Sequence, residues 1–443
     1  MVSPARGRGC HSNGGFFMRG KSTLPTFILA MATLLAMAPG VWAIRYYRAR
    51  FVQPTEWPRI DRFHPKPLIK VPETPVLRAK YPVFDTHIHL GDSGLSPEEV
   101  AGIMDSCGVA KLLNLEIYGW WGKELQRQIS EYQDKLPGRV ITACNINFSG
   151  IGSPGYTEAA VRQLEQDHRA GARAVKVWRN LGMDVRDVDG KRVPIDDPRL
   201  DPIWRKAGEL GMPVIFHTAD PSAYWYPVDA RNERFLALQV KPRPWGHRWS
   251  FPWGPLFHTV RTTLEPPVAK IRLVRHPELL YYATNVYPDP LPSKEELIRQ
   301  RDNVIRRHPE TIFIGAHMGC FPEDLEWVAR ELDEMPNYFV DISVSISEMG
   351  RQPYTAREFL IKYQDRVLFG LDGPPDVEAY RRTFRFLETF DEYFDYPWRE
   401  RFPQGEWKIY GVGLPDEVLR KIYFENAERI FGRQAERRTA ASQ

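Results

Sequence analysis

Val83-Phe84-Asp85-Thr86-His87-Ile88-His89-Leu90 is the stretch of sequence around which the fold is organised. Its apolar residues predict a short β-strand, and successive side chains of a strand point to opposite faces, so His87 and His89 point the same way. Two imidazoles side by side at a strand end can bind one divalent metal ion, and Asp85 on the same face can orient a ligand. A buried strand with two hydrogen-bonded histidines is the alternative, and the sequence downstream decides against it.

From Tyr81 onward, short apolar runs alternate with segments of helical period. The apolar runs predict eight strands, at residues 83–90, 111–118, 139–148, 172–178, 212–218, 311–317, 338–343 and 366–372. Helical patterns lie between them, at 97–109, 123–135, 157–170, 201–210, 294–308, 322–334 and 355–364. Repeated strand–helix units form a parallel sheet, and eight of them close into a barrel. We predict an α/β fold: a (β/α)8 TIM barrel with a long insertion after the fifth strand and with C-terminal helices.

Polar residues occupy the ends of the predicted strands, where a barrel of this kind carries its active residues. They are His87 and His89 on the first strand, Lys176 on the fourth, His217 on the fifth, His317 on the sixth and Asp372 on the eighth. A single one would be more typical of a structural residue, and an Asp before Gly-Pro-Pro often forms a turn. Their joint placement at one mouth of a barrel favours a catalytic site.

Four motifs resemble the amidohydrolase superfamily: Asp85-Thr86-His87-Ile88-His89, Phe216-His217-Thr218, Gly315-Ala316-His317-Met318-Gly319 and Phe369-Gly370-Leu371-Asp372. Over about residues 82–432 the chain is similar to the amidohydrolase-related branch. That branch includes aminocarboxymuconate-semialdehyde decarboxylase, resorcylate decarboxylases and pyrone-dicarboxylate lactonase. The resemblance implies that one divalent metal ion, usually zinc, binds to His87, His89, His217 and Asp372. It also implies that His317 acts on the substrate or its water.

The chemistry of these residues agrees with the ligand set that the resemblance implies. Three neutral imidazoles and one carboxylate suit Zn²⁺ and leave a position for water or substrate. A bound ion lowers the pKa of water towards ~7 and polarises a carbonyl group. Asp372 can accept a proton from that water, and a protonated His317 can stabilise an oxyanion or protonate a leaving group. Both residues are therefore predicted to be catalytic.

Lys176 has two interpretations. In other branches of the superfamily, a lysine on the fourth strand is carbamylated and bridges two metal ions. In the branch that this sequence resembles, one ion is usual. Lys176 is then expected to bind a substrate carboxylate or to belong to a hydrogen-bond network.

Residues 220–292 form the long insertion after the fifth predicted strand. Long loops in compact domains are often lids or binding loops, and an aromatic lid suits a ring-bearing or largely apolar substrate. Its candidate residues are Tyr224, Trp225, Tyr226, Glu233, Trp245, Trp249, Phe251 and Trp253. Glu233, and Trp120 after the second strand, are predicted to bind substrate. The alternative for the aromatic residues is that they hold the insertion to the barrel.

Residues 1–44 have the pattern of a signal peptide or a membrane anchor. A basic region ends at Lys21, an uncharged apolar run extends from Leu24 to Ile44, and Val41-Trp42-Ala43 resembles a signal-peptidase site. The run approaches the ~20 residues that span a bilayer, so an uncleaved anchor is the alternative. Both interpretations predict an extracytoplasmic protein, periplasmic or membrane-anchored, that contacts a membrane only through this segment.

The remaining organisation follows from composition. Residues 45–80, rich in Pro and Arg, predict a linker along the domain surface. Residues 81–433 are predicted to form the barrel domain, and residues 434–443 a disordered tail. The formal net charge of +4 resides in the first 43 residues, which hold four basic residues and no acidic one. The neutral remainder gives no reason to expect nucleic acid. Four scattered cysteines do not form a disulfide framework.

Three functions fit this sequence, and each implies a small-molecule ligand. The first is a metal-dependent hydrolase that attacks an ester, lactone or amide with a metal-activated water. The second is a non-oxidative decarboxylase of an aromatic or unsaturated carboxylic acid, with the substrate carboxylate near a cation such as Lys176. The third, a catalytically idle barrel that only binds a ligand, is disfavoured because the ligand set is intact. The resemblance is also compatible with a homodimer.

Overall fold

The computed structural model describes residues 66–91, 93–227, 229, 231–234, 291–399 and 404–432. The chain divides into two compact units, Met1–Leu68 and Ile69–Gln443, and the described residues belong almost entirely to the second. The predicted leader, most of the linker, most of the insertion after the fifth strand and the tail lie outside the described residues. In the part that is described, no helix is long and apolar enough to cross a membrane.

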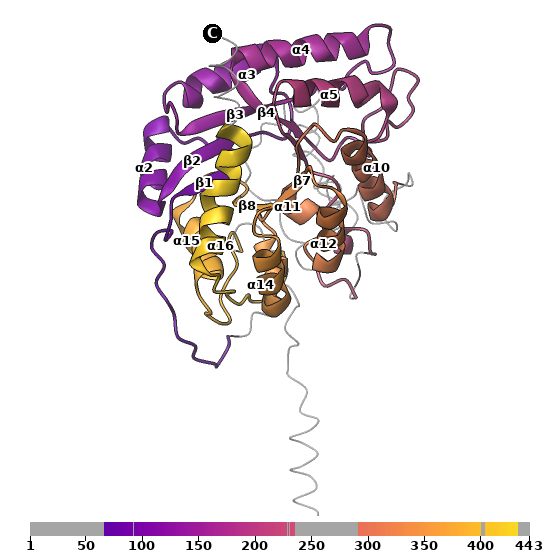
Figure 1. Ribbon diagram of the computed structural model, residues 1–443. Helices are drawn as coiled ribbons and strands as arrows, with labels where there is room; N and C mark the ends of the chain where they lie inside the picture. Colours follow the sequence, from indigo (N-terminus) through magenta and orange to yellow (C-terminus); the bar gives the residue numbers. More distant parts are fainter. Residues whose placement is uncertain are drawn as a thin grey trace, which may run out of the picture. The chain divides into compact units, whose positions relative to one another are not determined.

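The core of the second unit is a sheet of eight parallel strands that pair in sequence order (Figure 1). The strands are β1 (Val83–Ile88), β2 (Val109–Asn114), β3 (Val140–Asn145), β4 (Ala172–Val177), β5 (Val214–Phe216), β6 (Phe313–Gly315), β7 (Tyr338–Asp341) and β8 (Val367–Leu368). Each predicted strand is present, although most are shorter than predicted. The (β/α)8 TIM barrel is confirmed, as is the long insertion between β5 and β6.

Hydrogen bonds between β1 and the segment after β8 close the barrel. The amide of Thr86 donates to the carbonyl of Phe369 at 3.0 Å, and the amide of Asp372 donates to the carbonyl of His87 at 2.8 Å. The ends of the first and eighth strands therefore lie side by side, and they carry two of the predicted ligands.

Helices surround the strands, and local sequence sets their ends (Figure 1). For example, Ser96 and Glu99 form a capping box at the start of α2, and Gly108 ends it with φ 81°. The α-helices are α2 (Pro97–Cys107), α3 (Gly122–Gln128), α4 (Tyr156–Ala170), α5 (Asp201–Glu209), α10 (Lys294–Arg307), α11 (Ala316–Gly319), α12 (Leu325–Glu334), α13 (Ile346–Met349), α14 (Pro353–Lys362), α15 (Val377–Glu388) and α16 (Asp416–Arg420). Shorter helical turns are η2 (Ile129–Gln133), η3 (Pro198–Leu200), η4 (Ser222–Tyr224) and η5 (Lys421–Glu425).

The predicted C-terminal helices are present, and the last helical segment seals one end of the barrel. Phe84 on β1 packs against Phe431 with ring centroids 5.4 Å apart. Ala427, Ile430 and Phe431 join inward-facing strand residues in one buried apolar cluster. Burial of this much apolar surface stabilises the closed barrel and excludes water from its base.

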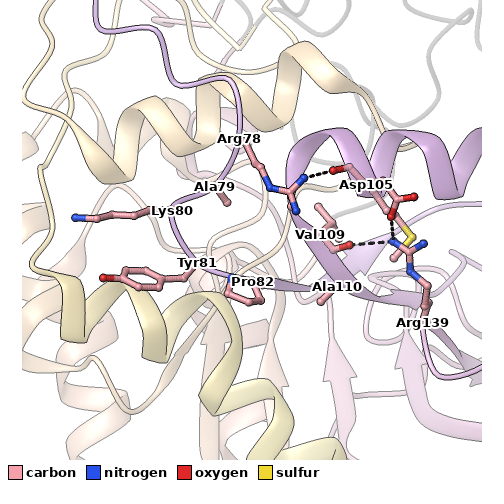
Figure 2. A pocket seen from close by; sticks show the side chains of 11 residues that line it. Arg78, Ala79, Lys80, Tyr81, Pro82, Asp105, Val109, Ala110 and Arg139 are labelled. Carbon is pink, nitrogen blue, oxygen red and sulfur yellow. Dashed lines mark hydrogen bonds and ion pairs between the residues drawn. The ribbon is translucent and has the colours of Figure 1, made fainter.

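A pocket of about 300 Å³ lies where β1 and β2 begin, at the end of the barrel opposite the strand ends that carry the predicted site (Figure 2). Arg78 and Arg139 line it, and both donate hydrogen bonds to Asp105, Arg139 to the carboxylate at 2.7 Å. Both arginines are thus already bound to a residue of the pocket wall, and the pocket is separate from the candidate site.

Candidate metal centre

Three of the predicted ligands converge at the mouth of the barrel. One carboxylate oxygen of Asp372, Oδ1, lies 3.0 Å from Nε2 of His89 and 3.7 Å from Nε2 of His87. The side chain of His87 is buried, whereas that of Asp372 is 28% exposed. Two imidazole nitrogens and a carboxylate oxygen facing one another are a donor set that Zn²⁺ and similar divalent ions bind.

The electrostatics of these three residues also suit a cation. Burial, helped by Lys176, lowers the pKa of His87 to about 4, so its imidazole is neutral at pH 7 and has a lone pair to offer. Burial opposes protonation of His89, but hydrogen bonds to Asp372 and Glu116 outweigh it and raise the pKa of His89 to about 9. The carboxylates thus attract positive charge at this position, and a metal ion can take the place of the proton. The residues present therefore fit a divalent ion.

His317 follows β6 in a left-handed helical turn. The φ angles of His317, Met318 and Cys320 are 57°, 57° and 64°. Residues other than glycine adopt this backbone conformation at a cost of about 1 kcal/mol or more each. The main-chain amide of His317 donates to Asp341 at 3.0 Å, and at the far end Arg301 donates to the carbonyl of Gly319 at 2.8 Å. Tertiary contacts at both ends hold the turn that presents this histidine.

His217, the fourth predicted ligand, contacts His317. Its Nδ1 lies 3.2 Å from Nε2 of His317, and its Nε2 lies 3.3 Å from Oδ1 of Asp220. Asp220 also accepts a hydrogen bond from Arg179 at 2.7 Å. Among the described residues, His217 belongs to neither group of donor atoms that lie within 4.8 Å of one another. Its role as a ligand stays a prediction.

Lys176 and Asp85 support the first histidine of the motif. The ammonium of Lys176 is buried, and Nζ lies 3.2 Å from Nε2 of His87. Burial lowers the pKa of Lys176 below its usual value. Oδ1 of Asp85 accepts from the main-chain amide of His87 at 2.9 Å, and Oδ2 accepts from the hydroxyl of Tyr380 at 2.7 Å. Asp85 therefore holds the backbone of the motif and not an imidazole.

Asp341 and Ser343, which the sequence analysis did not single out, lie at the centre of the site. Oδ2 of Asp341 lies 2.9 Å from Nδ1 of His87. The hydroxyl of Ser343 donates to Asp341 and lies 3.1 Å from Nδ1 of His87 and 2.8 Å from Nδ1 of His317. Asp341 ends β7, so the rule that found the other strand-end residues applies to it equally and would have found it.

Besides Lys176, the sequence predicts Trp120 and Glu233 as substrate-binding residues. Trp120 is buried, and its main-chain amide donates to Asn145 at 2.9 Å. Its ring packs so closely that a Cβ on Gly91 would lie 2.6 Å from it. The Glu233 carboxylate, 49% exposed, forms an ion pair with Arg351 at 2.8 Å. Contact of either residue with a substrate stays a prediction, and Trp245, Trp249, Phe251 and Trp253 lie outside the described residues.

Solved structures and one family profile are similar to this chain. Solved structures with similar chains include a TIM-barrel protein from Bordetella bronchiseptica (13% identity, 80% of this chain and 99% of that chain covered, TM-score 0.44). They also include a 2,6-dihydroxybenzoate decarboxylase from Rhizobium (16% identity, 80% of this chain and 99% of that chain covered, TM-score 0.43). A probable 2-pyrone-4,6-dicarboxylic acid hydrolase from Acinetobacter baumannii is also similar (9% identity, 79% of this chain and 99% of that chain covered, TM-score 0.41). A comparison with proteins of curated function found no match. The amidohydrolase family profile matches residues 136–433, more than half of the sequence, and the chain therefore belongs to the amidohydrolase family.

Proposed function

We propose that the protein is a metal-dependent hydrolase that acts on an ester, lactone or amide bond of a small molecule. One observation carries the proposal. Asp372 presents a partly exposed carboxylate whose Oδ1 faces the imidazoles of His87 and His89 at 3.7 and 3.0 Å. A carboxylate that faces both a cation site and the open mouth can serve as ligand and as proton acceptor.

The chain supplies the following roles in this proposal. His87, His89 and Asp372 hold the ion, with His217 as the further predicted ligand. Zn²⁺ is the ion that this donor set favours. When bound, such an ion lowers the pKa of water and polarises a substrate carbonyl. Asp372 accepts the proton of the attacking water, and His317, fixed in its left-handed turn, protonates the leaving group or stabilises the oxyanion.

A non-oxidative decarboxylase is the second candidate, and the position of Lys176 favours it. Its buried Nζ lies 3.2 Å from Nε2 of His87, beside the donor set. A buried ammonium gains most from a carboxylate partner, which the substrate of a decarboxylase would bring. The same ion and the same histidines serve both reactions, so the choice between them is one of substrate.

The two reactions are distinguished with one panel of aryl esters, lactones and aromatic carboxylic acids. The protein is first freed of metal with a chelator and then reloaded with Zn²⁺ or Mn²⁺. We expect hydrolysis that appears only after reloading. Release of CO₂ from any panel acid would favour the decarboxylase instead. A fully loaded protein that binds panel compounds without converting any of them would favour a binding module.

We also propose that residues 1–44 direct export. The support is the basic-then-apolar pattern of this segment. A fusion of residues 1–60 to a reporter that is active only outside the cytoplasm should be active, and an inactive reporter would reject export. Alkaline washing of membranes then separates an anchored chain, which stays in the pellet, from a cleaved one.

A further inference from the structure

Asp341 accepts hydrogen bonds from the two histidines and from Ser343. Oδ2 accepts from Nδ1 of His87 at 2.9 Å. Oδ1 accepts from the amide of His317 at 3.0 Å, from the amide of Ser343 at 3.1 Å and from the Ser343 hydroxyl. The two lone pairs of Oδ1 are thus fully engaged, whereas Oδ2 has one hydrogen-bond partner, the ring of His87. Asp341 contacts that ring through Nδ1, whereas Asp372 faces its Nε2.

These contacts fix the tautomers of both imidazoles. Oδ2 of an ionised Asp341 can only accept, so Nδ1 of His87 carries the proton and Nε2 bears the lone pair. Nδ1 of His317 lies 2.9 Å from the main-chain carbonyl of Ser343, which also can only accept, so Nδ1 of His317 carries a proton too. Both rings consequently present Nε2 away from β7. In His87 this nitrogen faces Nζ of Lys176 at 3.2 Å and Oδ1 of Asp372 at 3.7 Å.

We propose that Asp341 is the positioning residue that presents the Nε2 lone pair of His87 to the metal ion and, through the main-chain amide of His317, sets the position of the catalytic histidine. The inference rests on the proposed metal site and deepens it. One buried carboxylate on β7 thereby couples the ligand from β1 to the acid–base residue that follows β6. Residues of this kind commonly change metal affinity by about 10- to 100-fold when they are replaced.

Asp341→Asn and Asp341→Ala separate a tautomer effect from a packing effect. In the Asn variant, Oδ1 must keep facing the three donors from His317 and Ser343, so the new NH₂ group points at Nδ1 of His87. Two donors cannot share that contact, and a proton moved to Nε2 would meet the ammonium of Lys176 at 3.2 Å. Neither neutral tautomer of His87 then has a favourable partner at both nitrogens, so the Nε2 lone pair is less available to the ion. In the Ala variant, Nδ1–H can bond to water or to the hydroxyl of Ser343 and the useful tautomer survives.

The measurement is the affinity of the metal-free, full-length proteins for Zn²⁺, by competition with a chromophoric chelator. We expect a loss of about 100-fold for Asp341→Asn and of about 10-fold for Asp341→Ala. Asp167→Asn is the matched control, because Asp167 is equally buried but accepts its hydrogen bonds from Gly122 and Gln163, on α3 and α4, and it should bind Zn²⁺ like the wild type.

An Ala variant that binds Zn²⁺ as weakly as the Asn variant, or more weakly, would overturn the tautomer assignment. Variants that fail to give a native near-UV circular dichroism spectrum without metal would also overturn it, because they would place Asp341 among residues needed for folding. Failure of the wild type to bind Zn²⁺ would instead reject the proposed function itself. Ser343→Ala removes the hydroxyl that lies 2.8 Å from Nδ1 of His317 and so tests the positioning of the catalytic histidine. This variant should keep Zn²⁺ affinity within about threefold and lower kcat.

Discussion

Two layers inside the same barrel differ completely in chemistry, although only two residues separate them along β3, β4, β5 and β7. Side chains at positions i and i+2 of a strand face the same way, so both layers point into the barrel. The lower layer is apolar and includes Ala143, Ala174, Ile215 and Phe339. The upper layer is polar and includes Asn145, Lys176, His217 and Asp341. The C-terminal segment seals the lower layer, and the upper one reaches the mouth.

The comparison shows how one scaffold separates stability from chemistry. The lower layer is stabilised by removal of apolar surface from water. The upper layer buries polar groups, which is unfavourable unless each finds a partner. Asn145 has such partners, because its side-chain amide donates to the main-chain carbonyls of Glu116 and Lys176 at 2.9 and 3.0 Å. Substitutions in the upper layer should thus change function, and substitutions in the lower layer should change stability.

The largest effect is expected for Asp372→Asn, which removes a ligand and the proton acceptor together. Activity on the best panel substrate should fall by about 10⁴-fold, the upper range for removal of an acid–base group, and most bound metal should be lost. Activity assays and elemental analysis of the purified variant measure both. Tight, stoichiometric metal in this variant would remove Asp372 from the ligand set.

His317→Ala should affect the reaction but not the ion. Because His317 is proposed to act on the substrate, metal content should stay near that of the wild type while kcat falls by about 100-fold or more. His217→Ala is the comparison variant, since it replaces the ring in contact with His317 and should lose metal and activity together. Equal loss of metal in both variants would make His317 a ligand and favour a two-metal site with Lys176 as the bridge.

Phe431→Ala tests the lower layer from the sealed end of the barrel. Phe431 contacts Phe84 in the apolar cluster, so its removal leaves a cavity and should lower the free energy of unfolding by about 3 kcal/mol. Activity per folded molecule should not change. Tyr354→Ala is the control, because Tyr354 is 86% exposed and its loss should change stability by less than about 0.5 kcal/mol. A large drop in kcat for Phe431→Ala would contradict the separation of the layers.

Removal of the metal should lower stability slightly less than Phe431→Ala does. An ion that binds only the folded chain stabilises it by about 2.7 kcal/mol at a free concentration of 100 times Kd. Chelator-treated protein should therefore remain folded and unfold at a lower temperature than the reloaded protein. Differential scanning calorimetry measures the shift, and an unfolded metal-free protein would show that the upper layer also holds the fold.

Sequence periodicity was enough to predict the barrel, because each strand is a short apolar run and the longer helices have a regular amphipathic pattern. The same reasoning brought His87, His89 and Asp372 together, since ends of parallel strands meet at one mouth. The left-handed turn at His317 was not predictable. Met318 and Cys320 disfavour that conformation, and contacts from Asp341 and Arg301, distant in sequence, impose it.

The place of Glu233 could not be predicted for a related reason. Its partner Arg351 lies 118 residues further along the chain, and no local sequence pattern predicts an ion pair across such a separation. The residues around Asp341 differ in that they follow the strand-end rule. Extending the rule to every strand, whatever the residue type, would have found them.

We propose that the upper layer holds one divalent ion between His87, His89 and Asp372. Titration of the metal-free protein with Mn²⁺ measures this binding. Electron paramagnetic resonance measures the ion that stays free in solution. We expect one tightly bound Mn²⁺ per chain in the wild type and none in His89→Ala. No tight binding in the wild type, or unchanged binding in His89→Ala, would contradict it.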